Sequence, residues 1–306
     1  IVKPRATKSY ILIYAPNHYQ IKIILNVCLD IIMCIVFIYN GVNDAESEYS
    51  LILISNRDEH FNRLAQCMSP WIDDSTVYGG KDLEPGCEGG TWLAVAPISK
   101  KLGLLLNLPG VKKENAKSRG RIVSDYVRSE MAMTDYVEFI HDYSMQCNEF
   151  VFMSVEIGNL TAKIKTYSNA TDEINEWTDT YLGFSNSLPD RPLKKVEAGK
   201  KYLKDICSRL NKTKDKSQLI DELICLLKNK ERHLPDDQLE SRQPNLYKEL
   251  SSIFVHIPKG KYGTRAHTIM LLSKSGHIDL IEISMRSPID DENPYWERSE
   301  FQMDLL

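Results

Sequence analysis

Cys34 is a residue whose side chain could do chemistry, and it follows Met33 at the head of the apolar run 35–39. Its thiol could be a small buried group in a strand, part of a membrane anchor, or a nucleophile. A thiol with a pKa of about 8.5 needs a base at neutral pH, and a free α-amine with a pKa of about 7.7–8.0 can serve. A nucleophilic role therefore requires a free amine on Cys34. If that amine stays in a peptide bond, the buried-cysteine interpretation holds.

Polar clusters follow several apolar runs. Asn56, Arg57, Asp58 and Glu59 come just after the run Leu51–Ile54, and such a cluster by itself indicates a turn. The stretch EPGCEGGTWLAV is a glycine-rich turn that leads into a strand. It lacks both the G-x-G-x-x-G pattern and a following Lys-Ser/Thr, so it does not indicate a phosphate cradle.

Three further polar residues interrupt the apolar pattern. Asn107 in LLLNLPG and Asn186 in LGFSNS each close an apolar run, where a side-chain amide can cap a turn or donate to an oxyanion. Arg265 enters a late strand in KYGTRAHTIML. His60 and His256 have no partner at ligand spacing, so no metal site is predicted.

The order of these elements resembles the NRDE family, and more specifically the transport and Golgi organisation protein 2 group. The elements are Met-Cys, NRDE, EGGTW, SRG, GFSN and YGTR, and the match runs from Met33 to about Glu300. The resemblance implies roles in Golgi organisation and protein secretion, and in haem and lipid handling around mitochondria and the Golgi. The expected partner is a small molecule, haem or an acyl lipid, with haem as a transported ligand.

The family is similar to the choloylglycine-type N-terminal-nucleophile hydrolases. This implies an α+β, αββα sandwich of two stacked, mostly antiparallel sheets flanked by helices. Those enzymes have an arginine three residues before the aspartate, where this sequence has Ser55. Arg57 adjoins the aspartate instead, so its side chain is expected on the other face of the strand. Carried over by position, Cys34 matches the nucleophile, Asp58 the amine-orienting carboxylate, Asn107 and Asn186 the oxyanion amides, and Arg265 the arginine that supports the nucleophile.

Two functions stay open on these residues. One is a cysteine-dependent amidohydrolase or acyltransferase. The other is a non-catalytic trafficking protein whose old active-site cleft holds a ligand, and the altered arginine position favours it, since fold does not dictate function. Whether the protein is an enzyme is left undecided.

The elements that must position these residues follow from periodicity. Helical spacing predicts helices around 122–127, 193–210 and 219–227, and the polar stretch 229–248 is predicted to be a long surface loop. Strands at both ends with helices between them indicate an α+β fold. The lysine-rich segment 193–216 could bind anionic headgroups, but a solvated helix face is the simpler interpretation. Strands are predicted at Ile35–Tyr39, Ser50–Ile54, Trp92–Ala96, Leu102–Leu106, Phe150–Val155, Ala162–Thr166, Tyr181–Phe184, Ile253–His256, His267–Leu272 and Ile278–Ile283.

Composition bounds the remaining alternatives. The 306 residues, 42% of them hydrophobic and 26% charged, are typical of a globular protein, and a net charge of -4 gives no reason to expect nucleic acid. Seven scattered cysteines without a C-x-x-C pair favour a reducing compartment. The predicted location is the cytoplasm, in association with the Golgi or mitochondria. Oligomeric state is not predicted.

The N-terminal segment is predicted to be foreign to the domain. Residues 1–32 are interpreted as a disordered extension or a gene-model artefact, and 33–306 as a single NRDE domain. The apolar stretch 23–39 is the one membrane candidate, and Asp30 at its middle argues against a transmembrane span.

Overall fold

The computed structural model describes residues 33–158 and 161–305, which form an α+β fold with two antiparallel β-sheets. The first sheet has the strand order β10-β1-β2-β12-β13-β14, and the short β11 pairs with β12. Its strands are β1 (Ile35–Asn40), β2 (Tyr49–His60), β10 (Tyr181–Ser185), β11 (His256–Ile257), β12 (Tyr262–Ser273), β13 (His277–Met285) and β14 (Trp296–Asp304).

The second sheet follows the chain without a crossover, from β3 to β9. Each neighbouring pair in it is antiparallel. The strands are β3 (Ala65–Pro70), β4 (Tyr78–Asp82), β5 (Leu93–Ala96), β6 (Lys101–Asn107), β7 (Phe150–Ile157), β8 (Ala162–Ser168) and β9 (Glu173–Trp177).

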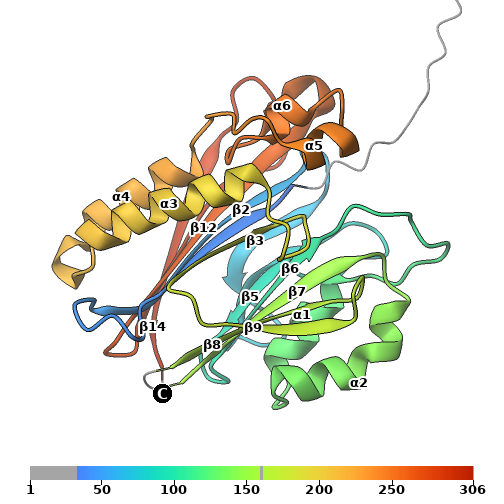
Figure 1. Cartoon of the computed structure of the whole chain (residues 1–306). Helices are drawn as coiled ribbons and strands as arrows, with labels where there is room; N and C mark the ends of the chain where they lie inside the picture. Colours follow the sequence, from blue (N-terminus) through green and yellow to red (C-terminus); the bar gives the residue numbers. More distant parts are fainter. Residues whose placement is uncertain (1–32, 159–160, 306) are drawn as a thin grey trace, which may run out of the picture. The chain divides into compact units, whose positions relative to one another are not determined.

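Helices cover the outer face of each sheet (Figure 1). α1 (Gly120–Arg128) and α2 (Met133–Met145) pack on the second sheet, and α3 (Lys194–Arg209) and α4 (Lys216–Leu227) lie along the first. The remaining short elements are α5 (Asp237–Arg242), α6 (Tyr247–Leu250) and the 3₁₀ turns η1 (Thr213–Asp215) and η2 (Pro258–Gly260). The layers are therefore helix, sheet, sheet, helix.

The continuous apolar run of β1 is explained by this layering. Ile35 and Phe37 point to the layer of α3 and α4, while Val36 and Ile38 point between the sheets, so alternate side chains of the strand enter different cores. Gly199 of α3 allows the helix to approach, because a Cβ there would lie 2.0 Å from the Phe37 ring.

Most of the predicted elements are confirmed. Nine of the ten predicted strands fall within, or one residue outside, an observed strand, and the three predicted helices correspond to α1, α3 and α4. The prediction at Ile253–His256 is wrong, because only His256 enters a strand, the two-residue β11. The predicted loop 229–248 is also wrong in part, because α5 and the start of α6 interrupt it.

Strands β3, β4, β9 and β14, and helix α2, were not predicted. β14 is an edge strand with side chains that are alternately exposed and partly exposed, so its sequence WERSEFQMD carries little apolar signal. The same holds for β9, which is exposed along most of its length. Propensity and patterning are weakest where a strand has only one neighbour and little burial.

The predictions for residues 1–32 lie outside the described residues. Of the membrane candidate 23–39, the described part includes Ile35–Tyr39, which belongs to β1, between β10 and β2 in the first sheet. No helix among residues 33–158 and 161–305 has the length and hydropathy to cross a membrane.

Candidate functional site

Cys34 lies at the entrance to β1, between two neighbouring strands. Ile35 is paired with Asn56 of β2 on one side and with Ser185 at the end of β10 on the other. Extending both antiparallel registers by one residue sets Cys34 opposite Arg57 and Asn186. Opposite residues on antiparallel strands share a face, so all three side chains point to the inter-sheet side.

The Cys34 thiol is not activated where it stands. It is partly buried against the inter-sheet core and donates to the carbonyl oxygen of Asp58 at 3.7 Å. Burial, reinforced by the negative charge of Asp58, raises the pKa of the Cys34 thiol to about 12. The thiol form therefore prevails at neutral pH, and its amine is joined to Met33.

Asp58 faces the opposite layer from the thiol. Its carboxylate is buried on the side of α3, where Oδ1 accepts a 2.6 Å hydrogen bond from the Thr264 hydroxyl and Oδ2 has no partner among the described residues. Burial raises the pKa of Asp58 to about 7, and the positive charge of Lys195 opposes this rise. The thiol contacts the main-chain carbonyl of Asp58 and not its carboxylate, and the expected role of Asp58 in orienting the amine of Cys34 stays a prediction.

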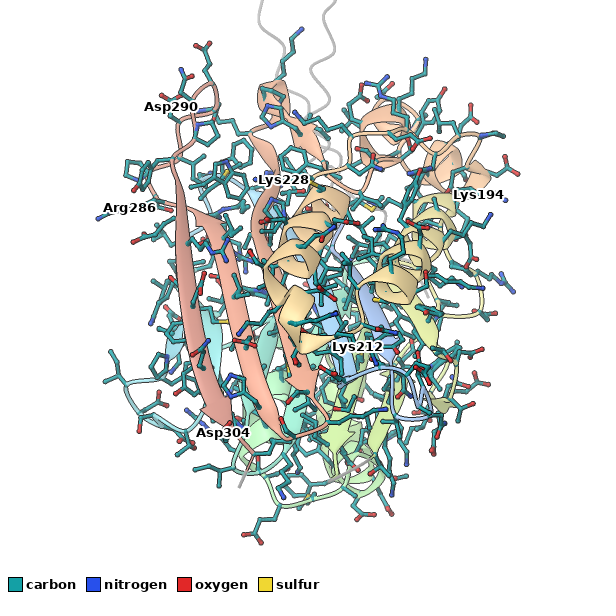
Figure 2. All side chains as sticks on the ribbon, turned by 90° about the vertical axis from the view of Figure 1, so that its left-hand side faces the viewer. Lys194, Lys212, Lys228, Arg286, Asp290 and Asp304 are labelled. Carbon is teal, nitrogen blue, oxygen red and sulfur yellow. The ribbon has the colours of Figure 1, made fainter. Side chains whose placement is uncertain are left out.

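Lys195 is a charged residue that the sequence analysis missed. It was grouped with the lysines of a solvated helix face, yet it is 0% exposed, and its Nζ donates to the carbonyl of Ser252 at 3.0 Å. Burial lowers its pKa, and the charge of Asp58 opposes that shift. Figure 2 looks onto α3 and α4 and labels Lys194, the exposed neighbour of Lys195, at the start of α3. The signal that could have found Lys195 is its place beside Val196 on the apolar stripe of the helix.

Asn56 fastens this end of the first sheet to the helical layer. Its Nδ2 donates to the carbonyls of Leu227 and Ile253, at 2.8 and 3.0 Å, and its Oδ1 lies 2.7 Å from Nδ1 of His267. Since Asn56 uses its amino group on the two carbonyls, Nδ1 of His267 carries the proton. Burial lowers the pKa of His267 to about 3, so the ring is neutral, and it stacks on Trp296.

The side-chain amide of Asn186, one of the two predicted oxyanion donors, contacts the main chain of the other, Asn107. Asn186 is buried, and its Nδ2 donates to the main-chain carbonyl of Asn107 at 2.5 Å, which joins the first sheet to the end of β6. Its Oδ1 has no partner among the described residues. One N–H of Asn186 is thus engaged, and a second is left for a ligand. The role of both residues in stabilising an oxyanion stays a prediction.

Arg265 lies in a bulge of β12 and is committed to the β2–β3 turn. Its Nη1 donates to the carbonyls of His60 and Arg63, at 2.9 and 2.6 Å, and Nη2 to the hydroxyl of Ser287 at 3.4 Å. Burial and the nearby Arg57 lower the pKa of Arg265 to about 10. Its described hydrogen bonds do not reach Cys34, so support for the nucleophile stays a prediction. Glu59, the last residue of the NRDE motif, pairs with Arg63 at 3.5 Å.

Arg57 completes the inter-sheet side of the site. Its guanidinium carbon lies 3.7 Å from the centroid of the Trp92 ring, in the EGGTW motif of the other sheet. Gly80 makes room for this ring, because a Cβ there would lie 2.2 Å from it. The expectation that Arg57 and Asp58 face opposite sides is confirmed. Cys34 shares the face of Arg57.

Two further observations concern metal ligands and a hollow elsewhere on the surface. The described residues contain no group of three His, Cys, Asp or Glu side chains placed to hold a metal ion. A hollow of about 340 Å³ opens at the Lys101 end of β6, opposite to the Asn107 end, and is therefore separate from the Cys34 site.

Comparison with known proteins agrees with the motif order. The family model described as Transport and Golgi organisation 2 matches residues 33–287. Transport and Golgi organization protein 2 of Drosophila melanogaster is 37% identical over 282 residues, which cover 89% of this chain and 99% of that protein. The homologues of Mus musculus and Homo sapiens are 30% and 29% identical over the same shares.

Proposed function

The chain belongs to the Transport and Golgi organisation 2 family, and from this premise we propose that it acts in Golgi organisation and protein secretion. In this proposal it handles a small apolar ligand, haem or an acyl lipid, without turning it over. The cellular part rests on the names of the relatives. The proposed location is the cytoplasm, in association with the Golgi or mitochondria. The two-sheet arrangement with flanking helices supports an N-terminal-nucleophile-hydrolase type of fold.

The proposal that the protein is not a catalyst rests on the protonation and surroundings of Cys34. Its thiol pKa is raised to about 12 by burial, the Asp58 carboxylate is on the other face, and the α-amine is bound to Met33. A cysteine nucleophile needs a lowered pKa or an adjacent base, and Cys34 has neither in this chain. The same end of the molecule still offers buried amide and guanidinium donors to a ligand.

Complementation tests the cellular part of the proposal. Cells that lack the protein are given the wild type or Cys34→Ala, and reporter secretion and Golgi morphology are measured. Both proteins are expected to restore secretion and morphology. A folded Cys34→Ala protein that restores neither would show that the thiol is required, and failure of the wild type would overturn the proposed role.

Ligand handling is tested on the purified protein. Haem and an acyl-coenzyme A are titrated while the absorption spectrum and the melting temperature are recorded. A ligand present at 100 times its Kd should stabilise the fold by about 2.7 kcal/mol, so a binding ligand is expected to raise the melting temperature measurably. If large excesses of both ligands produced no spectral change and no thermal shift, that result would contradict ligand handling.

A second candidate, cysteine-dependent hydrolysis or acyl transfer, is favoured by one observation. Oδ2 of Asp58 and the hydroxyl of Tyr262 are buried without partners among the described residues, on the side of the strand that faces away from the thiol. Such atoms could orient a free α-amine at Cys34. A protein beginning at Cys34 is therefore assayed with acyl-amide and acyl-thioester panels. Turnover that Cys34→Ala abolishes would establish this activity. Failure to detect a covalent acyl adduct on Cys34 would exclude it.

A further inference from the structure

Arg57 is a nearly buried cation without a hydrogen-bonding partner among the described residues. It is 8% exposed, and its guanidinium carbon lies 3.7 Å from the centroid of the Trp92 ring. No described carboxylate lies within the 4.0 Å that defines an ion pair with its guanidinium. A guanidinium has five N–H donors, and a buried one that lacks acceptors loses hydration without compensation. Its N–H groups must therefore take their acceptors from solvent or from a ligand.

The acidic residues around Arg57 make their hydrogen bonds to other groups, and Oε2 of Glu282 has no partner among the described residues. Glu59 accepts from the main-chain N–H of His60 and pairs with Arg63, and Asp82 receives a 2.7 Å bond from Arg63. Glu282 accepts from the main-chain N–H of Met68, and burial raises its pKa. The positive charge of Arg57 is therefore not neutralised by a direct contact with any of the three.

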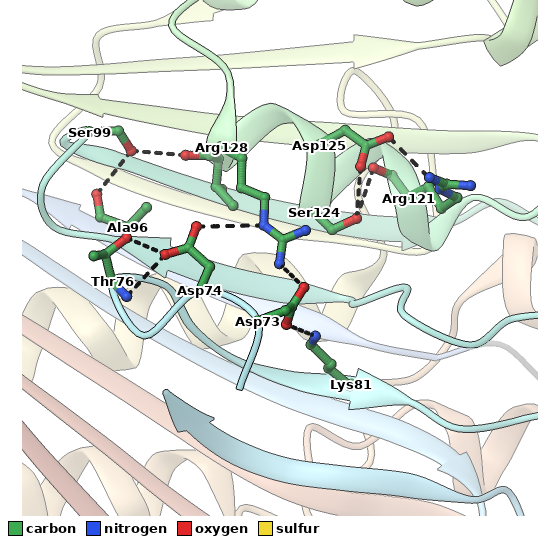
Figure 3. Close-up of polar contacts among 11 residues, drawn as sticks. Asp73, Asp74, Thr76, Lys81, Ala96, Ser99, Arg121, Ser124, Asp125 and Arg128 are labelled. Atoms are coloured by element: carbon green, nitrogen blue, oxygen red, sulfur yellow. Dashed lines mark hydrogen bonds and ion pairs between the residues drawn. The ribbon is translucent and has the colours of Figure 1, made fainter. Parts of the chain in front are cut away.

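A second arginine that lies over a tryptophan ring, Arg128, has carboxylate partners within the chain. Arg128 lies 4.7 Å from the Trp71 ring centroid, and its guanidinium reaches Asp73 at 2.5 Å and Asp74 at 3.7 Å. Figure 3 shows these two carboxylates around Arg128, with Lys81 on the far side of Asp73. Arg57 is more buried than Arg128 and lies closer to its ring, but it has no described counterpart to these two aspartates.

We propose that Arg57, whose guanidinium lies over the Trp92 ring, is the binding site for the carboxylate of an apolar organic acid beside Cys34. The proposal deepens the ligand-handling function and rests on it. A guanidinium that is fixed by an aromatic face presents its N–H groups along one planar edge, and this edge matches a carboxylate through two parallel hydrogen bonds. The free N–H of Asn186, on the other side of Cys34, can serve the same ligand.

The surroundings favour an apolar acid over a free inorganic anion. Trp92 and Leu188 are partly buried and pack against the same inter-sheet core as Cys34. These side chains can cover an alkyl chain, and burial of each CH₂ group contributes about 0.8 kcal/mol. A ligand whose head pairs with Arg57 and whose tail covers this surface would also shield the Cys34 thiol.

The test measures octanoate binding by calorimetry, with 1-octanol and inorganic phosphate as matched ligands. Octanoate is expected to bind the wild type, with at least tenfold weaker binding to Arg57→Gln and several-fold weaker binding to Arg57→Lys, which keeps the charge but loses the planar fork. Arg128→Lys, the control at the paired stack, should bind octanoate like the wild type. Equal octanoate affinity in Arg57→Gln, or equal affinity of the wild type for phosphate or octanol, would overturn the proposal.

Thiol protection provides a measurement that needs no variant to fold. Octanoate should slow the alkylation of Cys34 in the wild type and leave the exposed Cys225 unaffected. Alkylation of Cys34 at an unchanged rate in saturating octanoate would place the ligand elsewhere. Haem and acyl-coenzyme A are titrated in parallel: if they bind the wild type and Arg57→Gln alike, ligand handling stands and the Arg57 site falls.

Discussion

Arg57 and Asp58 are adjacent in the chain, but they serve two different layers of the molecule. Asp58 enters the layer between the first sheet and α3, where it has Thr264 as a hydrogen-bonding partner and Lys195 as an opposing charge. Arg57 enters the layer between the sheets, where its contact is the face of Trp92. On the helix side, the polar side chains bond to one another and to the main chain, and they stabilise the fold. On the inter-sheet side, the N–H donors of Arg57 have no acceptor among the described residues. We therefore expect mutations on the helix side to reduce stability and mutations on the inter-sheet side to reduce ligand binding.

The largest effect is expected from Asn56→Ala on the helix side. This change leaves the carbonyls of Leu227 and Ile253 and the N–H of His267 without their partner in a buried place. An unpaired buried polar group costs about 1–3 kcal/mol, so we expect unfolding to become about 3–4 kcal/mol easier by urea titration. Asn175→Ala at an exposed site of β9 is the control and should change stability by less than about 0.5 kcal/mol.

Lys195→Met should destabilise the protein by about 2–3 kcal/mol at pH 8, because it leaves Asp58 buried without its opposing charge. The loss should be smaller at pH 5, where Asp58 is protonated. Urea titrations at the two pH values measure this difference, with the exposed Lys194→Met as the matched control. The same loss at both pH values would mean that Lys195 contributes packing rather than charge.

Asp58→Asn should change the pH dependence of stability. The pKa of Asp58 is about 7 in the fold and lower, at its ordinary value of 3.8, in the unfolded chain, so the folded state favours the protonated acid. That stabilisation is complete below pH 4 and is lost as the pH rises to about 7. The variant should therefore gain stability relative to the wild type between pH 4 and pH 7. A constant difference across this range would contradict the raised pKa.

The smallest effect concerns the reactivity of Cys34 on the inter-sheet side. At pH 8 the exposed Cys225 should react with iodoacetamide well before Cys34, whose thiol pKa is raised to about 12. Arg57 favours the thiolate of Cys34, so Arg57→Gln should slow alkylation further, by up to about tenfold. Mass spectrometry of timed samples measures both rates. Faster labelling in the variant would mean that Arg57 shields the thiol instead.

Much of the fold could be predicted because local sequence patterns indicate most of its strands and helices. Apolar runs located most of the strands, and alternation along an extended strand required Arg57 and Asp58 to face opposite layers. β14 and β9 could not be found in this way, since their positions depend on pairing with one neighbour rather than on burial of their own side chains. Short helices such as α5 are set by contacts within the surrounding segment, such as the bond from the Leu239 N–H to Asp236.

The sequence by itself determined the family and the α+β class, because these follow from motif order and side-chain periodicity. Tertiary structure alone decided which groups are partners. It buried Lys195 near Asp58, directed Asn56 to the end of α4, and left Arg57 on Trp92 without an acceptor among the described residues. Charge pairing and desolvation depend on distances between segments that are far apart in the chain, and no local pattern contains those distances.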